Sequence, residues 1–250
     1  MIDLRGRHVL ITGASSGLGR ACAITASRAG ATITALGRDS GRLQETIGQL
    51  VPGPHRAQAI DITQYAALDG VVADAVQANG PIAGFIHSAG IQKSIPLKGM
   101  TPESLHEIFA INVTAGLELT RIITKKKHAV PEGMSIILMG STMSSLGDAS
   151  LSAYCATKAA LLGAVKALAV ELAPRRIRVN CLSPGITQTE MLREALSQLP
   201  AETQQAFVAK HPLGLGQPDD VANAAAFLLS DLSRWITGTN FLVDGGYSAQ

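Results

Sequence analysis

Short apolar segments alternate with longer amphipathic segments along almost the whole chain. The apolar segments predict strands, at 8–11, 32–37, 58–60, 84–87, 135–139, 178–181 and 241–243. The segments between them predict helices, at 20–29, 41–50, 65–77, 101–126, 153–172 and 218–230. Strands that alternate with helices over short connections pair in parallel, so the pattern predicts one doubly wound sheet with helices on both faces.

This alternation predicts a single α/β domain over residues 1–250, with about seven strands in a Rossmann-type parallel sheet. One stretch departs from the pattern. Residues 186–217 contain Pro200, Pro212 and several glycines around a helix or two, and such a long excursion in a compact domain is typically functional. We therefore expect a substrate lid at about 186–217.

Composition narrows the classes of partner. The chain is 46% hydrophobic and 16% charged with a net charge of +2, so it can bury a large core and has no general affinity for nucleic acid or membranes. Its three cysteines lack paired spacing, which disfavours disulfides and a zinc site and favours a reducing cytoplasm. No apolar run reaches the ~18 residues of a membrane span, and the first residues lack the apolar core of a signal peptide. We expect a cytoplasmic protein without a metal.

A glycine-rich turn follows the first predicted strand. It reads Thr-Gly-Ala-Ser-Ser-Gly-Leu-Gly over residues 12–19 and leads into the helix at 20–29. A strand, a glycine loop and a helix in that order bring backbone N–H groups and the positive end of a helix dipole together. This context favours a site for the pyrophosphate of a dinucleotide over a plain turn.

Ser141, Tyr154 and Lys158 are the candidate chemical groups. Tyr154 and Lys158 stand four residues apart on a predicted helix and share one of its faces. A neighbouring ammonium favours the phenolate and lowers the pKa of a tyrosine. Ser141 follows the strand at 135–139, at the edge of the sheet where ligands bind. The set suits proton transfer to a carbonyl oxygen while a cofactor supplies hydride, although this Tyr and Lys spacing is also common on solvated helix faces.

Asn112 lies among apolar neighbours inside the predicted helix at 101–126. Helix interiors disfavour Asn, and a buried amide needs hydrogen-bond partners. Asn112 therefore either holds water and backbone in a network or is a tolerated, satisfied amide.

Five motifs, in this order, resemble the short-chain dehydrogenase/reductase family, and the match covers nearly the whole chain. They are the glycine loop Thr12-Gly13-x-x-x-Gly17-x-Gly19, Asp61, Asn112, the set of Ser141, Tyr154 and Lys158, and Pro184-Gly185. The C-terminal segments 236–238 and 243–246 also resemble the family. The pattern is most similar to that of 3-oxoacyl-(acyl-carrier-protein) reductases, through residues 184–191 and 212–218.

The resemblance implies a role for each matching residue. Tyr154 would be the acid/base, and Ser141 would hold the carbonyl oxygen. Lys158 would lower the pKa of Tyr154 and bind the nicotinamide ribose, while Asn112 would anchor a water for a proton relay. The residues that would contact the cofactor are Gly13, Ser15, Ser16, Gly17, Leu18, Gly19, Arg38, Asp61, Ile62, Ala89, Gly90, Tyr154, Lys158, Pro184, Gly185, Thr187 and Thr189.

One segment departs from the family pattern. The family usually has Asn-Asn-Ala-Gly after the fourth strand, whereas this chain has His87-Ser88-Ala89-Gly90. The change puts the local hydrogen bonding of that strand in question, although Ser can both donate and accept. His87 itself is expected to be a satisfied core histidine outside the site.

The end of the second strand bears on the choice of cofactor. Enzymes that select NAD usually place Asp or Glu there, whereas this chain has Gly37 followed by Arg38. A guanidinium can bind a 2′-phosphate with paired, charge-assisted hydrogen bonds, and Ser15 or Ser16 can add a hydroxyl donor. We therefore expect NADP(H) rather than NAD(H), with Asp39 as the contrary signal.

The sequence thus favours an NADP(H)-dependent oxidoreductase that reduces a ketone, such as a 3-oxoacyl thioester, to a secondary alcohol. A sugar, polyol or other secondary-alcohol dehydrogenase of the same family remains open. A non-catalytic dinucleotide-binding sensor is disfavoured because the Ser, Tyr and Lys set is complete.

Two surface features concern partners. The apolar helices at 101–126 and 153–172 predict a symmetric subunit contact, and the family resemblance implies a homotetramer built as a dimer of dimers. The basic segment 125–127, together with Arg175, Arg176 and Arg178, either attracts an acidic carrier protein that bears the substrate or is an ordinary solvated surface.

Overall fold

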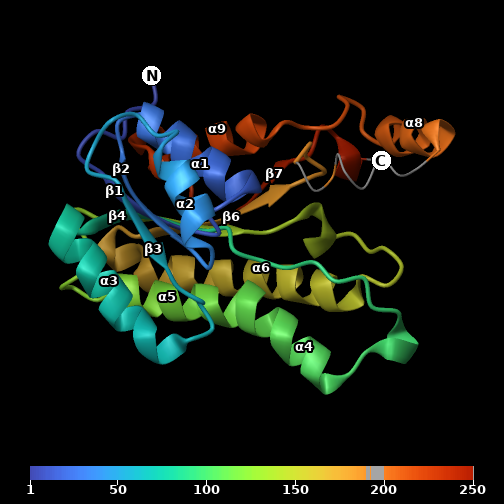
Figure 1. Cartoon of the computed structure of the whole chain (residues 1–250), viewed down its shortest axis with the longest axis horizontal. Coiled ribbons are helices and arrows are strands. Elements are labelled where there is room, and N and C mark those ends of the chain that lie inside the picture. Colours follow the sequence, from blue (N-terminus) through green and yellow to red (C-terminus); the bar gives the residue numbers. More distant parts are fainter. Residues whose placement is uncertain (190–191, 193–199, 250) are drawn as a thin grey trace.

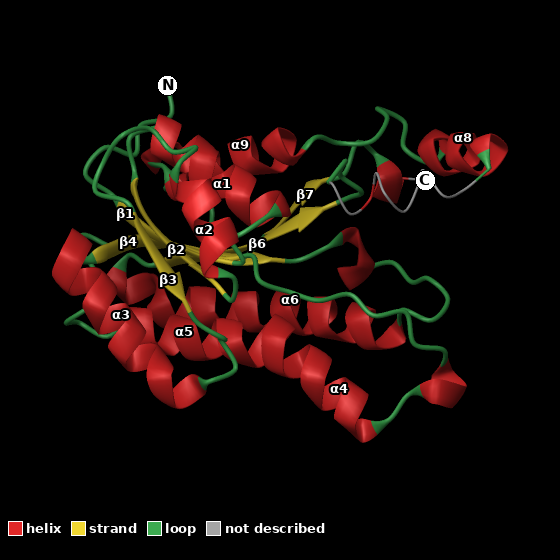
Figure 2. Cartoon of the chain, in the orientation of Figure 1, coloured by secondary structure: helices red, strands yellow, loops and turns green. Residues whose placement is uncertain are grey.

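The computed structural model describes residues 1–189, 192 and 200–249, and within them seven strands form one parallel sheet (Figures 1 and 2). The strands are β1 (His8–Thr12), β2 (Thr32–Gly37), β3 (Arg56–Ala59), β4 (Ile82–His87), β5 (Ser135–Met139), β6 (Arg178–Pro184) and β7 (Asn240–Val243). Their order across the sheet is β3-β2-β1-β4-β5-β6-β7, and every neighbouring pair is parallel. The predicted doubly wound α/β fold is confirmed.

Helices cover both faces of the sheet. The described helices are α1 (Gly17–Arg28), α2 (Ser40–Ile47), α3 (Tyr65–Asn79), α4 (Pro102–Phe109), α5 (Ala115–Ile123), α6 (Ser152–Leu172), α8 (Ala201–Ala209) and α9 (Pro218–Leu229). Figure 1 shows α1, α2 and α9 on one face and α3, α4, α5 and α6 on the other. Each face has its own apolar core, and β1, β4 and β5 are buried along their whole length, which explains their nearly continuous apolar sequences.

The predicted helix at 101–126 is interrupted in the structure. Its start is as predicted, because Thr101 caps α4 by accepting a hydrogen bond from the Ser104 nitrogen at 3.3 Å, with Pro102 in the first turn. At Ala110–Thr114 the helix widens into a π turn before α5 continues. Such a turn inserts an extra residue and is frequent at functional sites. Here it carries Asn112.

The predicted lid at 186–217 falls partly outside the described residues, since 190–191 and 193–199 are not described. Its described part contains α8 and a β-bridge between Thr187 and Gly216. Its C-terminal end packs on the chain terminus, where the His211 and Tyr247 rings stack with their centroids 4.7 Å apart.

One described helical stretch, Ser152–Arg175, would satisfy the length and apolarity of a membrane span, which is weak evidence by itself. It contains α6, which packs against β6 and contributes Leu161, Val165 and Ala169 to one of the two cores. The helix α6 is therefore part of the helical layer that covers this face of the sheet.

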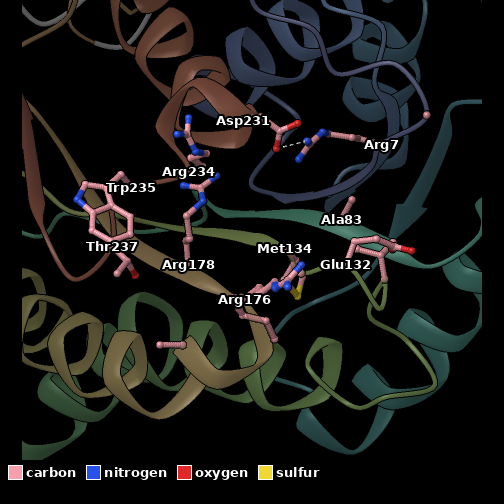
Figure 3. A pocket seen from close by; sticks show the side chains of 15 residues that line it. Arg7, Ala83, Glu132, Met134, Arg176, Arg178, Asp231, Arg234, Trp235 and Thr237 are labelled. Atoms are coloured by element: carbon pink, nitrogen blue, oxygen red, sulfur yellow. Dashed lines mark ion pairs between the residues drawn. The ribbon is translucent and has the colours of Figure 1, made fainter.

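A cavity of about 830 Å³ lies at the amino-terminal edge of the sheet, where β1, β5 and β6 begin (Figure 3). Two of the arginines that line it, Arg7 and Arg178, donate hydrogen bonds to the C-terminal end of α9. The Arg178 guanidinium donates to the Leu228 and Ser230 carbonyls at 2.8 and 3.2 Å, and Arg7 donates to the Leu229 carbonyl at 3.1 Å. Figure 3 shows Arg7 and Asp231 pointing toward one another, and they form an ion pair at 2.6 Å. The last carbonyls of a helix have no partner within it, so these side chains complete α9.

We expect Arg178→Met to lower the free energy of unfolding by ~1–3 kcal/mol, because it leaves helix-end carbonyls without their charged donor. Urea unfolding measures the change. Arg234→Met is the matched control, since Arg234 lines the same cavity but is exposed, and a change within about 0.5 kcal/mol is expected there. Equal effects of the two substitutions would contradict this role of Arg178.

Candidate active site

A cleft of about 580 Å³ opens at the carboxyl-terminal edge of the sheet, where β1 and β4 are neighbours. The strand order reverses between these two strands, and such switch points are where open α/β sheets bind ligands. Every residue predicted to contact a cofactor lines the cleft except Thr187 and Thr189. The cleft also contains residues that were not predicted, which are Gly37, Ile60, Ser88, Ile91, Gln92, Ile111, Met139 and Gly140. Most of these lie at or just beyond a strand end, which is the signal that could have identified them.

The glycine loop is shaped for close approach. Gly13 has φ of +68°, and a Cβ added there would lie 2.7 Å from the Ala89 nitrogen, so only glycine fits. The start of α1 is open, because the Ser16 side chain makes no capping hydrogen bond and the first turn has no acidic residue. Uncapped N–H groups at the positive end of a helix suit a phosphate. The loop therefore fits the pyrophosphate of a dinucleotide.

The far end of the cleft is formed by Gly37, Arg38 and Asp61. The Asp61 carboxylate accepts hydrogen bonds from the Thr63 backbone and hydroxyl at 2.9 and 2.7 Å, and these bonds, helped by the Arg38 charge, lower its pKa. Asp39 does not line the cleft, because its carboxylate caps α2 by accepting from the Arg42 nitrogen at 3.0 Å. The contrary signal for NAD(H) in the sequence is thus explained by a helix cap.

Tyr154, Lys158 and Ser141 meet on one wall of the cleft. Tyr154 and Lys158 lie on the first two turns of α6, as their spacing predicts, and the lysine ammonium is 5.6 Å from the centre of the tyrosine ring. Lys158 is buried and donates to the Met139 carbonyl at 2.8 Å. Ser141 follows β5, and its hydroxyl oxygen accepts from the Met143 nitrogen at 3.1 Å. That bond leaves the Ser141 hydroxyl proton free to donate.

The pKa of Tyr154 differs from the sequence expectation. We expected the Lys158 charge to lower it, whereas burial raises it, and a hydrogen bond with Ser141 opposes that rise. Burial disfavours the phenolate more strongly than the sequence could indicate, because that burial arises from tertiary packing. Tyr154 therefore begins as a neutral phenol, the form that donates a proton. Burial also lowers the pKa of Lys158 to about 8.

Asn112 is buried, and its side chain is committed to protein partners. Its amide nitrogen donates to the Ile91 carbonyl at 2.9 Å and to the Thr157 hydroxyl at 3.1 Å, and its amide oxygen accepts from the Ile91 nitrogen at 2.8 Å. Asn112 does not line the cleft. Of the two sequence interpretations the structure favours the satisfied amide, and the water of the relay stays a prediction.

The two predicted residues outside the cleft lie beyond β6. Thr187 is buried and bridges to Gly216. Thr189 lies beside the glycine loop, since its methyl group would be 3.8 Å from a Cβ at Gly17. Among the described residues no group of three His, Cys, Asp or Glu side chains is placed to hold a metal ion.

Comparisons with known proteins agree along nearly the whole chain. A family model described as enoyl-(acyl carrier protein) reductase matches residues 13–248. D-erythrulose reductase of Gallus gallus is 33% identical over 247 residues, which cover 98% of this chain and 97% of that protein. A 3-oxoacyl-(acyl-carrier-protein) reductase of Escherichia coli is 32% identical over 250 residues, or 98% of each chain. The solved structure of a Serratia marcescens short-chain dehydrogenase/reductase double mutant has a TM-score of 0.90 at 25% identity and covers 98% of this chain and 99% of that one.

The buried ammonium of Lys158 predicts a dependence of stability on pH. Its folded pKa of about 8 lies below its ordinary value of 10.5, so between these two pH values the unfolded chain holds a proton that the folded protein has released. The free energy of unfolding therefore rises with pH across this window. At pH 7 the charge costs roughly 3–4 kcal/mol, since the pKa is lowered from 10.5 to about 8 and each pKa unit corresponds to about 1.4 kcal/mol.

We accordingly expect Lys158→Met to increase the free energy of unfolding at pH 7 by about 1 kcal/mol, because removal of the buried charge outweighs the loss of the bond to the Met139 carbonyl. Urea unfolding at several pH values measures this change, and the rise above pH 8 should weaken in the variant. Lys166→Met, on the exposed side of α6, should change neither quantity. A Lys158→Met protein that is less stable at pH 7 would contradict the prediction.

Proposed function

The chain belongs to the short-chain dehydrogenase/reductase family, whose members act on secondary alcohols and ketones, and on that premise we propose that it reduces a ketone to a secondary alcohol with NADP(H). One observation carries the proposal. A phenol, a hydroxyl and an ammonium, from Tyr154, Ser141 and Lys158, line one wall of a cleft whose other end fits a dinucleotide.

Ser141, Tyr154 and Lys158 have different roles in the proposed reaction. A bound nicotinamide dinucleotide supplies the hydride that reaches the carbonyl carbon. Ser141 donates a hydrogen bond to the carbonyl oxygen, and Tyr154 transfers its phenolic proton to the same oxygen as negative charge develops there. The Lys158 ammonium stabilises the phenolate that remains. The product is the neutral alcohol, and in the reverse direction Tyr154 must first lose its proton.

The preference for NADP(H) rests on charge at the far end of the cleft. Arg38 is exposed there and free to meet a 2′-phosphate, while Gly37 offers no carboxylate to repel it. The nearest acidic side chain in sequence, Asp39, caps α2 instead. These three features support NADP(H) over NAD(H).

Two substrate classes follow from different observations. A 3-oxoacyl thioester agrees with the sequence pattern and with the E. coli relative. A small hydroxylated ketone agrees with the D-erythrulose reductase likeness. The basic surface that could attract a carrier protein is reduced in the structure, because Lys125 and Lys127 pair with Asp69 and Arg178 serves the end of α9. This favours a substrate that arrives free rather than on a carrier.

We also propose a cytoplasmic enzyme that assembles as a dimer of dimers. The outer side of α6 carries apolar side chains without cover in the single chain, such as Val170, which is 78% exposed. A symmetric contact through α4, α5 and α6 would bury that side.

The proposed activity is tested by following the loss of NADPH absorbance with a panel of 3-oxoacyl thioesters, keto sugars and cyclic ketones. We expect Tyr154→Phe to lower kcat on the best substrate by at least ~10²-fold to 10⁴-fold, because a positioned general acid is removed. The phenyl ring keeps the packing, so the affinity for NADPH should stay nearly unchanged. Wild-type turnover by Tyr154→Phe would show that Tyr154 is not the acid, and absence of wild-type turnover on the whole panel would overturn the activity.

The cofactor preference is a separate prediction. A charged hydrogen-bonded pair contributes ~1.5–3 kcal/mol, so kcat/KM and fluorescence-measured affinity should favour NADPH over NADH by about tenfold to a hundredfold or more. The double variant Gly37→Asp/Arg38→Leu should reverse the preference.

Gly37→Ala is the matched control for that double variant. A Cβ at Gly37 would lie 3.3 Å from a Leu43 methyl group and 3.4 Å from Ser15, so the control measures any steric cost by itself. Equal use of both cofactors by the wild type, or a double variant that still prefers NADPH, would show that this site does not set the choice.

A further inference from the structure

His87 ends β4 directly beneath the cleft and is buried. It stands where the family usually has Asn. Its neighbours are the end of β1 on one side and α5 on the other, where Gly116 leaves room for the ring. A Cβ at Gly116 would lie 2.5 Å from a carbon and 2.9 Å from Nε2 of the imidazole. The ring is therefore fixed in place by close packing.

Hydrogen bonds at Thr12 determine which ring nitrogen of His87 carries the proton. The Thr12 hydroxyl oxygen accepts from the Ala89 nitrogen at 3.2 Å and lies 3.0 Å from Nδ1 of His87. Among the described residues, the structure shows no other hydrogen bond that could take the Thr12 hydroxyl proton, so we assign this proton to the bond with Nδ1. Burial lowers the pKa of His87 to about 4, which keeps the ring neutral. The single ring proton then lies on Nε2.

The Nε2 atom of His87 lies beside Gly116, at the start of α5 directly after the π turn. It is buried and has no hydrogen-bond partner among the described residues. The backbone of Ile111 and Asn112 nevertheless acts on the ring as a hydrogen-bond acceptor and opposes the fall of the His87 pKa. A π turn disturbs the regular ladder of helix hydrogen bonds, so a carbonyl there gains from an outside donor. A buried N–H without a partner costs ~1–3 kcal/mol, which favours closure of this contact.

We propose that His87 is a positioning residue whose Nε2–H supports the π turn at Ile111 and Asn112, while Nδ1 holds Thr12 and, through it, the Ala89 backbone. One ring then links the floor of the cofactor cleft to the turn that carries Asn112. Asn112 in turn donates to the Thr157 hydroxyl on α6. The His87 ring therefore influences the position of Tyr154, which lies one helical turn before Thr157. The inference deepens the proposed function and rests on it.

Three substitutions separate the two ends of the ring. His87→Gln keeps an N–H near the position of Nε2, whereas His87→Asn reaches only as far as Nδ1. His87→Phe keeps the volume and removes both nitrogens. We expect kcat for the best ketone of the panel to fall by about tenfold to a hundredfold in the Asn and Phe variants, because small displacements of reacting groups have effects of that size. The kcat of the Gln variant should stay within a few fold of wild type. The KM for NADPH should rise in the Gln and Phe variants, which lose the Nδ1 bond to Thr12, and stay near wild type in the Asn variant.

His8→Phe is the control for a loss of buried histidine hydrogen bonds in general. His8 begins β1, at the opposite edge of the sheet, and bonds to Gly80 and Thr34 at 2.7 and 2.8 Å. Its replacement should lower stability but leave kcat unchanged. If kcat in His87→Asn equals or exceeds that in His87→Gln, the ring acts only through Thr12 and the proposal is overturned.

A measurement without substrate separates this inference from the proposed activity. Nitrogen NMR of ¹⁵N-histidine-labelled protein, with the His87 signals assigned by their loss in His87→Gln, should show a protonated Nε2 and an unprotonated Nδ1 at neutral pH. A proton on Nδ1 would refute the role of Nε2 even in an active enzyme. If the tautomer is as stated but the wild type reduces no ketone, the proposed activity fails while the assignment of the proton to Nε2 stands.

Discussion

The buried side chain of Asn112 holds together three segments that must keep their relative positions for the site to exist. It binds both backbone groups of Ile91 after β4 and the Thr157 hydroxyl on α6, while its own backbone lies in the π turn. The Thr157 hydroxyl donates in turn to the Tyr154 carbonyl at 2.7 Å. Leaving a buried amide unsatisfied costs ~1–3 kcal/mol per group, which disfavours arrangements of these segments that break its hydrogen bonds. This amide therefore helps to fix the position of Tyr154 relative to the cleft.

The two edges of the sheet differ in how completely their polar groups are hydrogen-bonded by the protein. At the amino-terminal edge, Arg7 and Arg178 satisfy the last carbonyls of α9, which stabilises the fold. At the carboxyl-terminal edge, the start of α1 is left uncapped and Lys158 is buried as a cation against a single carbonyl. Both features lower the stability of the fold. The uncapped start of α1 favours binding of an anion, and the Lys158 ammonium favours negative charge that develops during the reaction. The carboxyl-terminal edge is therefore the reactive one because its polar groups are incompletely satisfied by the protein itself.

Local pattern was enough to predict most of the fold from the sequence. Continuous apolar runs mark buried parallel strands, and the glycine loop, Ser141, Tyr154 and Lys158 stand at offsets that fix their place on strand ends and one helix face. The π turn could not be predicted, because the partners of Asn112 lie 21 and 45 residues away in the chain. The pKa of Tyr154 was expected in the wrong direction for the same reason, since its burial depends on packing that no local pattern encodes. Thr187 faces Gly216 rather than the cleft through a bridge between two irregular segments.

At the end of the cleft that contains Arg38, hydrogen bonds join the glycine loop to α2. The Arg20 guanidinium donates to the Ser15 carbonyl at 2.6 Å and to the Thr46 hydroxyl at 3.0 Å, and Thr46 donates to the Ala14 carbonyl at 2.9 Å. These bonds tie α2 to the glycine loop, while Asp39 caps the start of α2 beside Arg38. The residues that would meet a 2′-phosphate therefore cannot shift independently of those that would meet the pyrophosphate. Preorganisation of this kind reduces the ordering cost of binding. Under the proposed preference for NADP(H), it would let the exposed Arg38 contribute selectivity although isolated surface charges contribute little.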